Sequence, residues 1–213
     1  MFDLSIFCGT SEEPRSYLHT PWIERGGVAA TDGHVMVFVE SPQMVSGDVK
    51  DTTPKAMIGK MDKFLDLEFS GNAHPLSGID IPKLKCPMCE GSRFLVSTIC
   101  EDCNGEGEFQ HGAHWYSCQE CEGDGKNHVA ADKGSTNSAL CPYCSGIGIK
   151  KFADSDPYVK IGEVYVAPNI LTRVNTLPNA VLYVGDDPGG SVTFRFDGGR
   201  GVLMPLDMRR IKK

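Results

Sequence analysis

Short blocks of apolar positions occupy the start of the chain, with turn-forming residues between them. Residues 2–8, 21–30 and 34–39 are typical of β-strands because apolar side chains dominate them. Gly26-Gly27 and Asp32-Gly33 punctuate these blocks and favour tight turns. The first forty residues therefore predict a β-hairpin preceded by a further strand.

A helical period follows these strands. From Thr53 onward, the sequence has a capping residue, Pro54 at the first helical position, and apolar side chains at the spacing of helical turns. This segment predicts an amphipathic helix. Its apolar positions are Met57, Ile58, Met61, Phe64 and Leu65.

The last third of the chain again mixes strands with one helix. Residues 158–167 alternate as a single strand, and residues 168–177 place apolar side chains on one helical face. Three closing strands are expected at 180–184, 191–196 and 201–206, joined by turns rich in Asp, Pro and Gly. The predicted order is strand, helix and three strands.

Between these two parts, cysteine becomes frequent. Eight of the nine cysteines form four C-x-x-C pairs within 59 residues, whereas Cys8 stands alone. In a reducing cytosol this pattern favours metal over disulfides, and four pairs of thiolates are the ligand set of two tetrahedral zinc sites. We therefore predict two bound Zn²⁺ ions. The predicted ligands are Cys86, Cys89, Cys100, Cys103, Cys118, Cys121, Cys141 and Cys144.

Composition narrows the class of protein further. Apolar residues make up 40% of the 213 positions and charged residues 23%, and no apolar run approaches the ~20 residues that span a bilayer. The first residues lack the pattern of a secretory signal. We expect a cytoplasmic protein with no membrane partner. The net charge of −7 argues against indiscriminate coating of nucleic acid.

Charge divides the chain along the same line as cysteine. Residues 86–148 carry nine acidic and three basic side chains, whereas the other 150 residues carry 19 acidic and 18 basic ones. Two Zn²⁺ bound by eight thiolates would make the cysteine-rich segment more negative still. We predict two domains: a discontinuous one over 1–82 and 152–213, and an inserted acidic module over 83–151.

Glycines follow the cysteine pairs at fixed positions. Three of the four repeats read C-x-x-C-x-G-x-G, and Arg93 replaces the last glycine of the first repeat. Glycine reaches the positive φ angles of a tight turn around a metal. The segment resembles the cysteine-rich domain of DnaJ-type co-chaperones, which carries four such repeats and binds two zinc ions. The sequence has no His-Pro-Asp tripeptide of a J-domain, so the resemblance does not extend to a complete co-chaperone.

The resemblance to DnaJ implies a nested pairing of the repeats. In that family the first and fourth motifs share one zinc, and the second and third share the other. The intervals between first cysteines, 14, 18 and 23 residues, do not determine the pairing, so sequential pairing stays open. Nested pairing assigns one zinc to Cys86, Cys89, Cys141 and Cys144, and the other to Cys100, Cys103, Cys118 and Cys121.

Two features of the cysteine-rich segment suggest other chemistry. Cys141-Pro142-Tyr143-Cys144 matches the tetrapeptide of glutaredoxin active sites, so thiol-disulfide oxidoreductase or holdase-like activity is an alternative. That activity needs a thiolate at a helix N-terminus in a thioredoxin-like fold, a context that the sequence lacks. His111, His114 and His128 are candidate substitute ligands, but eight cysteines already suffice for two zinc ions.

Three short segments of the first and last parts carry a second resemblance. They are Arg15-Ser16-Tyr17-Leu18, residues 28–34 (VAATDGH) and residues 201–206 (GVLMPL). Together they resemble one domain of a bacterial DNA sliding clamp. In that family the Ala-Thr-Asp-Gly-His turn joins two sheet strands, and a Met-Pro pair lies on the last strand of the domain. A clamp chain contains several such domains, whereas this sequence has one copy.

The sequence as a whole predicts an α+β protein: a clamp-like antiparallel sheet with two helices, interrupted by a β-hairpin-rich two-zinc module. We expect a non-enzymatic protein-binding or adaptor protein, because no catalytic motif emerges. A DNA-associated replication accessory factor related to sliding clamps is the alternative, and encircling DNA would require a homo-oligomer. Its candidate phosphate contacts are Lys55, Lys60, Lys63, Lys83, Lys85, Lys150, Lys151, Arg173, Arg209, Arg210, Lys212 and Lys213.

Overall fold

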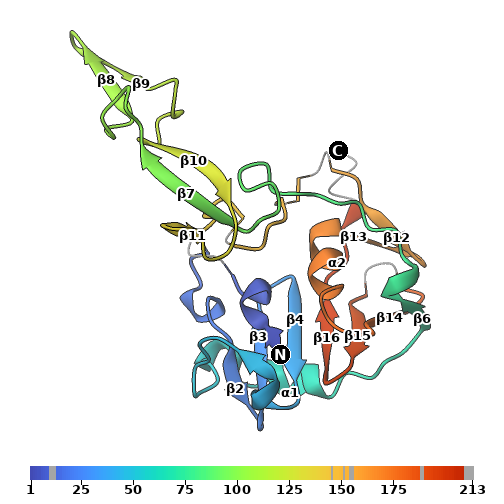
Figure 1. Cartoon of the computed structure of the whole chain (residues 1–213). Coiled ribbons are helices and arrows are strands. Elements are labelled where there is room, and N and C mark those ends of the chain that lie inside the picture. Colours follow the sequence, from blue (N-terminus) through green and yellow to red (C-terminus); the bar gives the residue numbers. More distant parts are fainter. Residues whose placement is uncertain (10–12, 145, 151, 154–155, 188–189, 209–213) are drawn as a thin grey trace. The chain divides into compact units, whose positions relative to one another are not determined.

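The computed structural model describes residues 1–9, 13–144, 146–150, 152–153, 156–187 and 190–208. The chain forms two compact units (Figure 1). We call Met1–Lys83 together with Phe152–Lys213 the sheet unit, and Leu84–Lys151 the cysteine unit. Most regular structure is β-sheet, and the described residues contain two α-helices, α1 (Lys60–Leu65) and α2 (Pro168–Val174). Neither helix is long and apolar enough to cross a bilayer, nor is any other helix in the described part of the chain.

A seven-stranded antiparallel sheet forms the centre of the sheet unit (Figure 1). Its strand order is β2-β3-β4-β16-β15-β14-β6. The bounds are β2 (Trp22–Glu24), β3 (Gly27–Thr31), β4 (Val35–Val39), β16 (Gly199–Leu203), β15 (Val192–Phe196), β14 (Val181–Val184) and β6 (Asn72–Pro75). Two pairs complete the unit: parallel β1 (Phe2–Asp3) and β5 (Val45–Ser46), and antiparallel β12 (Val159–Ile161) and β13 (Val164–Val166).

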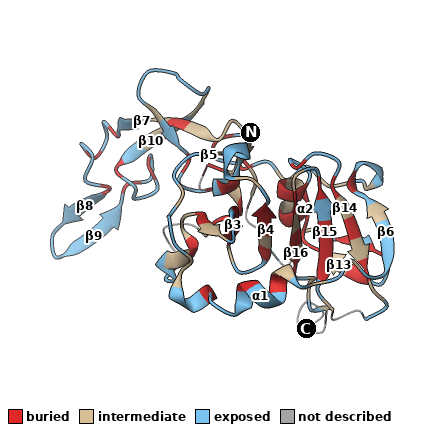
Figure 2. Cartoon of the chain, turned by 90° about the horizontal axis from the view of Figure 1, so that it is seen from below, coloured by how far each residue is buried: buried red, intermediate tan, exposed pale blue. Residues whose placement is uncertain are grey.

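Apolar side chains cover both faces of this sheet. Because successive strand residues point to opposite faces, Val37 and Phe38 belong to different clusters. Val37 packs in the large cluster with Leu171 of α2. Phe38 packs with Met61 and with Phe64 of α1. The sheet unit is therefore a layered domain with an ordinary apolar core, seen as the largely buried strands β15 and β16 in Figure 2.

The cysteine unit contains short strands only. A three-stranded sheet has the order β10-β7-β11, with bounds β7 (Phe94–Ile99), β10 (Lys126–Ala131) and β11 (Ser138–Leu140). A separate hairpin joins β8 (Glu108–His111) to β9 (His114–Ser117). All eight residues of β8 and β9 are exposed, as the pale-blue hairpin in Figure 2 shows.

Most of the predicted strands are present, namely the hairpin within residues 21–39 and the three closing strands. The prediction of one strand over residues 2–8 is wrong after Asp3. The Asp3 carboxylate accepts hydrogen bonds from the backbone N–H and the hydroxyl of Ser5 and caps a 3-10 helix, Leu4–Phe7. Leu4 and Phe7, three positions apart, are both buried on one side of that turn, which explains why the segment looked like an apolar strand.

Glycines divide two segments that the pattern predicted as continuous. The helix predicted from Thr53 is a short 3-10 turn, Lys55–Met57, followed by α1, because Gly59 takes a left-handed conformation with φ of 75°. Ile58, expected on its apolar face, is exposed. The strand predicted over 158–167 is the hairpin β12–β13, which turns at Gly162 with φ of 58°. Both differences arise at a positive φ angle, which glycine adopts more readily than other residues.

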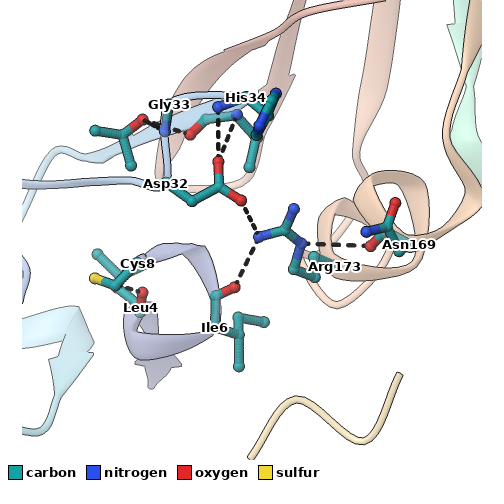
Figure 3. Close-up of polar contacts among 10 residues, drawn as sticks. Leu4, Ile6, Cys8, Asp32, Gly33, His34, Asn169 and Arg173 are labelled. Atoms are coloured by element: carbon teal, nitrogen blue, oxygen red, sulfur yellow. Dashed lines mark hydrogen bonds and ion pairs between the residues drawn. The ribbon is translucent and has the colours of Figure 1, made fainter. Parts of the chain in front are cut away.

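A buried ion pair ties α2 to the turn between β3 and β4 (Figure 3). Nη1 of Arg173 lies 2.6 Å from Oδ2 of Asp32 and donates to the carbonyl oxygen of Ile6 at 3.2 Å. The other carboxylate oxygen of Asp32 accepts from the backbone N–H groups of His34 and Val35. Arg173 was a candidate phosphate contact, and that interpretation is wrong because its side chain is 6% exposed and paired with Asp32.

We predict that Arg173→Met lowers the free energy of unfolding by about 3 kcal/mol, because it leaves the Asp32 carboxylate, which is 15% exposed, without its cation. The same substitution at the exposed Arg195 is the control, and its expected loss is below about 1 kcal/mol. Urea denaturation of both variants measures the difference. Equal losses would show that the buried pair contributes nothing specific.

Candidate metal centres and a surface pocket

All eight cysteines of the C-x-x-C pairs are buried and meet in two groups of four. The first group contains Cys86, Cys89, Cys141 and Cys144, and the second contains Cys100, Cys103, Cys118 and Cys121. Within each group the Sγ atoms lie within 4.8 Å of one another. The structure therefore brings the first repeat to the fourth and the second to the third, which is the nested grouping and not the sequential one.

The sulfur geometry suits a metal rather than disulfides. Sγ–Sγ distances are 3.9 Å for Cys86–Cys141 and 3.7 Å for Cys89–Cys144. The second group repeats these values for Cys100–Cys118 and Cys103–Cys121. A tetrahedron with Zn–S bonds of about 2.3 Å has edges of roughly 3.8 Å, whereas a disulfide requires about 2.05 Å. Each group could bind one metal ion, and the donor set is consistent with two Zn²⁺ ions.

Backbone hydrogen bonds join the paired repeats reciprocally. In the first centre, the N–H of Cys86 donates to Gly148 O at 3.0 Å, and that of Cys141 donates to Arg93 O at 2.8 Å. In the second, Cys100 donates to Gly125 O and Cys118 donates to Gly107 O. The first cysteine of each repeat thus bonds to the last motif position of its partner. The same motif builds both centres.

The last glycine of each complete repeat serves the sulfur directly. Backbone N–H groups of Gly107, Gly125 and Gly148 each donate to the Sγ of the cysteine four residues earlier, at 3.2 Å. Their φ angles are 78°, 74° and 78°. Arg93, which replaces the fourth of these glycines, takes φ of 76° and so keeps the same turn. The backbone repeat is therefore complete although the sequence repeat is not.

Arg93 has a contact that the sequence did not indicate. Its Nε donates to the carbonyl oxygen of Gly146 in the fourth repeat. A glycine at this position could not make that side-chain bond between the paired repeats. The signal available in the sequence was the departure itself, an arginine where the other three repeats have glycine.

Hydrogen bonds also tune the thiols. Burial opposes ionisation of Cys103, yet the N–H of Gly107 and the neighbouring thiols of Cys100 and Cys121 together lower the pKa of Cys103 to about 7. A thiolate is the form that binds metal. The N–H groups of the turn thus favour the ligand form of this sulfur.

The other candidate ligands lie elsewhere. His111 and His114 are exposed on the β8–β9 hairpin, and His128 lies on β10, where it bonds to Asp124 and Ser97. None of the three belongs to either cysteine group. Cys8 is buried in the sheet unit, where burial raises the pKa of its thiol to about 12. An inert thiol fits its place in the apolar core.

The sheet unit contains a pocket of about 270 Å³ on the α1 side of the sheet. Four segments of the sequence line it: residues 15–18, the β3–β4 turn region, residues 57–60 at the start of α1, and the end of β16 with Met204. Lys60 supplies positive charge, Arg15 lines the pocket as the partner of Glu13 in an ion pair of 2.6 Å, and His34 adds a further polar group. The apolar lining consists of Leu18, Val35, Met36, Met57, Val202 and Met204.

Lys55, Lys60, Lys63, Lys83 and Lys85, proposed as phosphate contacts, are exposed, and Lys150 is half-buried. Lys151, Arg209, Arg210, Lys212 and Lys213 lie outside the described residues. With Arg173 buried, the described helices present only the lysines of the α1 region to a duplex.

The nested grouping predicts the metal content of double serine variants. Cys86→Ser with Cys141→Ser removes two ligands from one centre and should leave one zinc per chain. Cys86→Ser with Cys100→Ser removes one ligand from each centre and should weaken both. Elemental analysis coupled to native mass spectrometry counts the metal after mild chelation. Sequential pairing would reverse the two outcomes.

Gly107 provides a test of the turn itself. A Cβ atom at Gly107 would lie 2.3 Å from the carbonyl oxygen of Gly123, whereas one at Gly112 meets nothing within 4 Å. Both residues have positive φ, so Gly112→Ala controls for backbone strain. We expect Gly107→Ala to weaken zinc binding by more than about 1 kcal/mol beyond that control. Competition with a chromophoric chelator measures it, and equal zinc affinities would contradict the role assigned to this contact.

Comparison with known proteins places the chain in no family. No protein-family model matches it. No curated protein matches its sequence either. The interpretation of the metal centres and the pocket therefore rests on their geometry and chemistry.

Proposed function

We propose that this chain is a non-enzymatic zinc-binding adaptor that holds a partner protein through the pocket of the sheet unit. The observation that carries the proposal is the apolar lining of that pocket, from Leu18 to Met204, next to the cation of Lys60 and the Arg15–Glu13 ion pair. Sites of this kind take an apolar side chain as anchor and use a few polar groups to orient the bound chain. A segment of a partner protein meets both requirements.

The position of the pocket supports a clamp-like character for the sheet unit. The three segments that resemble a sliding-clamp domain are Arg15–Leu18, residues 28–34 and residues 201–206. Residues from all three line this one pocket. Short similarities that are scattered in the sequence and converge in space favour a shared surface over chance. We infer that the surface is used for protein binding.

The nested repeats support a DnaJ-type character for the cysteine unit. The clusters of buried residues in this unit consist of the eight cysteines and Leu95. So few apolar side chains cannot stabilise a unit of this size, and metal supplies what is missing. We assign the zinc ions a structural role and place the protein in the cytoplasm, where thiols stay reduced.

Duplex DNA has less support as a partner. The described basic residues that remain accessible near the helices are those of the α1 region, and Lys60 already lines the pocket. General binding to a duplex requires many phosphate contacts. We therefore favour a protein partner for this face of the sheet unit.

A displayed library of random dodecapeptides, selected on the full chain, tests the proposal. Enriched peptides should share an apolar residue and should bind Met204→Glu at least about tenfold more weakly, because the new carboxylate enters an apolar pocket. Met44→Glu is the matched control, since Met44 is an exposed methionine of the same unit outside the pocket. Enriched peptides that bind both variants equally would place the binding site elsewhere, and a library without enrichment would oppose the proposal.

A further inference from the structure

The β8–β9 hairpin of the cysteine unit exposes an unusual number of aromatic side chains. Phe109, Trp115 and Tyr116 are 44%, 59% and 54% exposed. The two strands pair only with each other among the described residues, and all eight of their residues are exposed. Exposed apolar surface of this kind marks interaction sites, and Tyr, Trp and Phe are the residues enriched there.

Strand register divides the rings between the two faces. Phe109 lies directly opposite Tyr116, and His111 lies directly opposite His114, two positions further along. Residues two apart on a strand share a face, so these four rings line one side of the hairpin. Trp115 lies opposite Gln110 on the other side. On one face of the hairpin, the two neighbouring cross-strand pairs, Phe109–Tyr116 and His111–His114, thus consist of rings alone.

The segment that contains the hairpin carries charge of one sign. Residues 100–125 contain seven acidic side chains and no lysine or arginine. Glu106, Glu108, Glu120 and Glu122 are exposed, and in the described part of the structure none of them has a cationic partner. A zinc ion held by four thiolates in the second centre would add a net charge of −2 next to the hairpin.

Aromatic rings and negatively charged side chains both attract cations. Lysine and arginine cations bind over Phe, Tyr and Trp rings, and carboxylates attract the same cations. An acidic or phosphate-rich partner would be repelled. We propose that the ring face of β8–β9, formed by Phe109, Tyr116, His111 and His114, is a docking surface for a basic segment of a partner protein. This surface lies in the cysteine unit and is independent of the pocket proposed above.

Synthetic acetyl-Arg-Arg-Ile-Lys-Lys-amide, a basic sequence that also occurs at residues 209–213, serves as the probe. Calorimetric titration into the zinc-loaded full chain should show binding that weakens as salt is raised. The charge-reversed peptide acetyl-Glu-Glu-Ile-Glu-Glu-amide should bind at least about tenfold more weakly.

The double variant Phe109→Ser with Tyr116→Ser removes two of the four rings of this face, both of them uncharged. We expect it to weaken binding of the basic peptide at least about tenfold, with the zinc content of two per chain retained as evidence that the unit is folded. Tyr143→Ser is the matched control, because Tyr143 is equally exposed in the same unit but lies in the fourth repeat. This control should bind like the unaltered chain.

Three results would overturn the proposal: no binding of the basic peptide at millimolar concentration, equal binding of both peptides, or equal affinity of the double variant and the unaltered chain. A single-stranded oligonucleotide that binds more tightly than the basic peptide would identify a nucleic-acid surface instead. Met204→Glu should leave basic-peptide binding unchanged, so failure of the pocket and failure of the hairpin surface are separable.

Discussion

Four sulfur atoms drawn from opposite ends of a long segment are the constraint on which the cysteine unit depends. Cys86 and Cys141 are 55 positions apart in the chain, yet their Sγ atoms lie 3.9 Å apart. Four thiolates at this spacing repel one another unless a cation lies between them, so ligand charge, metal and backbone turn form one interdependent arrangement. The reciprocal bonds between paired repeats extend to Leu84 and Lys150, whose backbone atoms are 2.9 Å apart, and so hold the two ends of the unit together.

Two cysteine clusters in place of an apolar core have a consequence for the surface. In the sheet unit, large side chains such as Trp22 and Phe194 are buried because hydrophobic burial stabilises that fold. In the cysteine unit, Leu95 is the one non-cysteine residue in the buried clusters of the described chain. The aromatic side chains of the cysteine unit are therefore not required for packing its interior, and those on β8–β9 face solvent. A metal-held unit can present rings to a partner at little cost to its own stability.

In the sheet unit, the feature that depends on long-range contacts is the pocket, which segments distant in the sequence line together. Asp32 accepts two backbone N–H bonds within the β3–β4 turn and pairs with Arg173 of α2. The turn residues Thr31, Gly33 and His34 line the pocket. The Arg173–Asp32 ion pair thus links α2, which packs on one face of the sheet, to the β3–β4 turn, whose residues line the pocket. The stability of the sheet unit and the protein binding that we propose for its pocket therefore both depend on this ion pair.

Local patterns determined the candidate metal ligands and most of the strands. Ligand identity depends on residue type and short spacing, so the eight cysteines and the nested grouping implied by the DnaJ-type repeats could be named from the sequence, as could the hairpin within residues 21–39. Only the tertiary structure decided what depends on long-range contact: the burial of Arg173 against Asp32, the convergence of four segments on one pocket, the bond from Arg93 to Gly146, and edge strand β6. The physical reason is that backbone angles and ligand spacing are encoded within a few residues, whereas burial and pairing depend on partners that the local sequence does not contain.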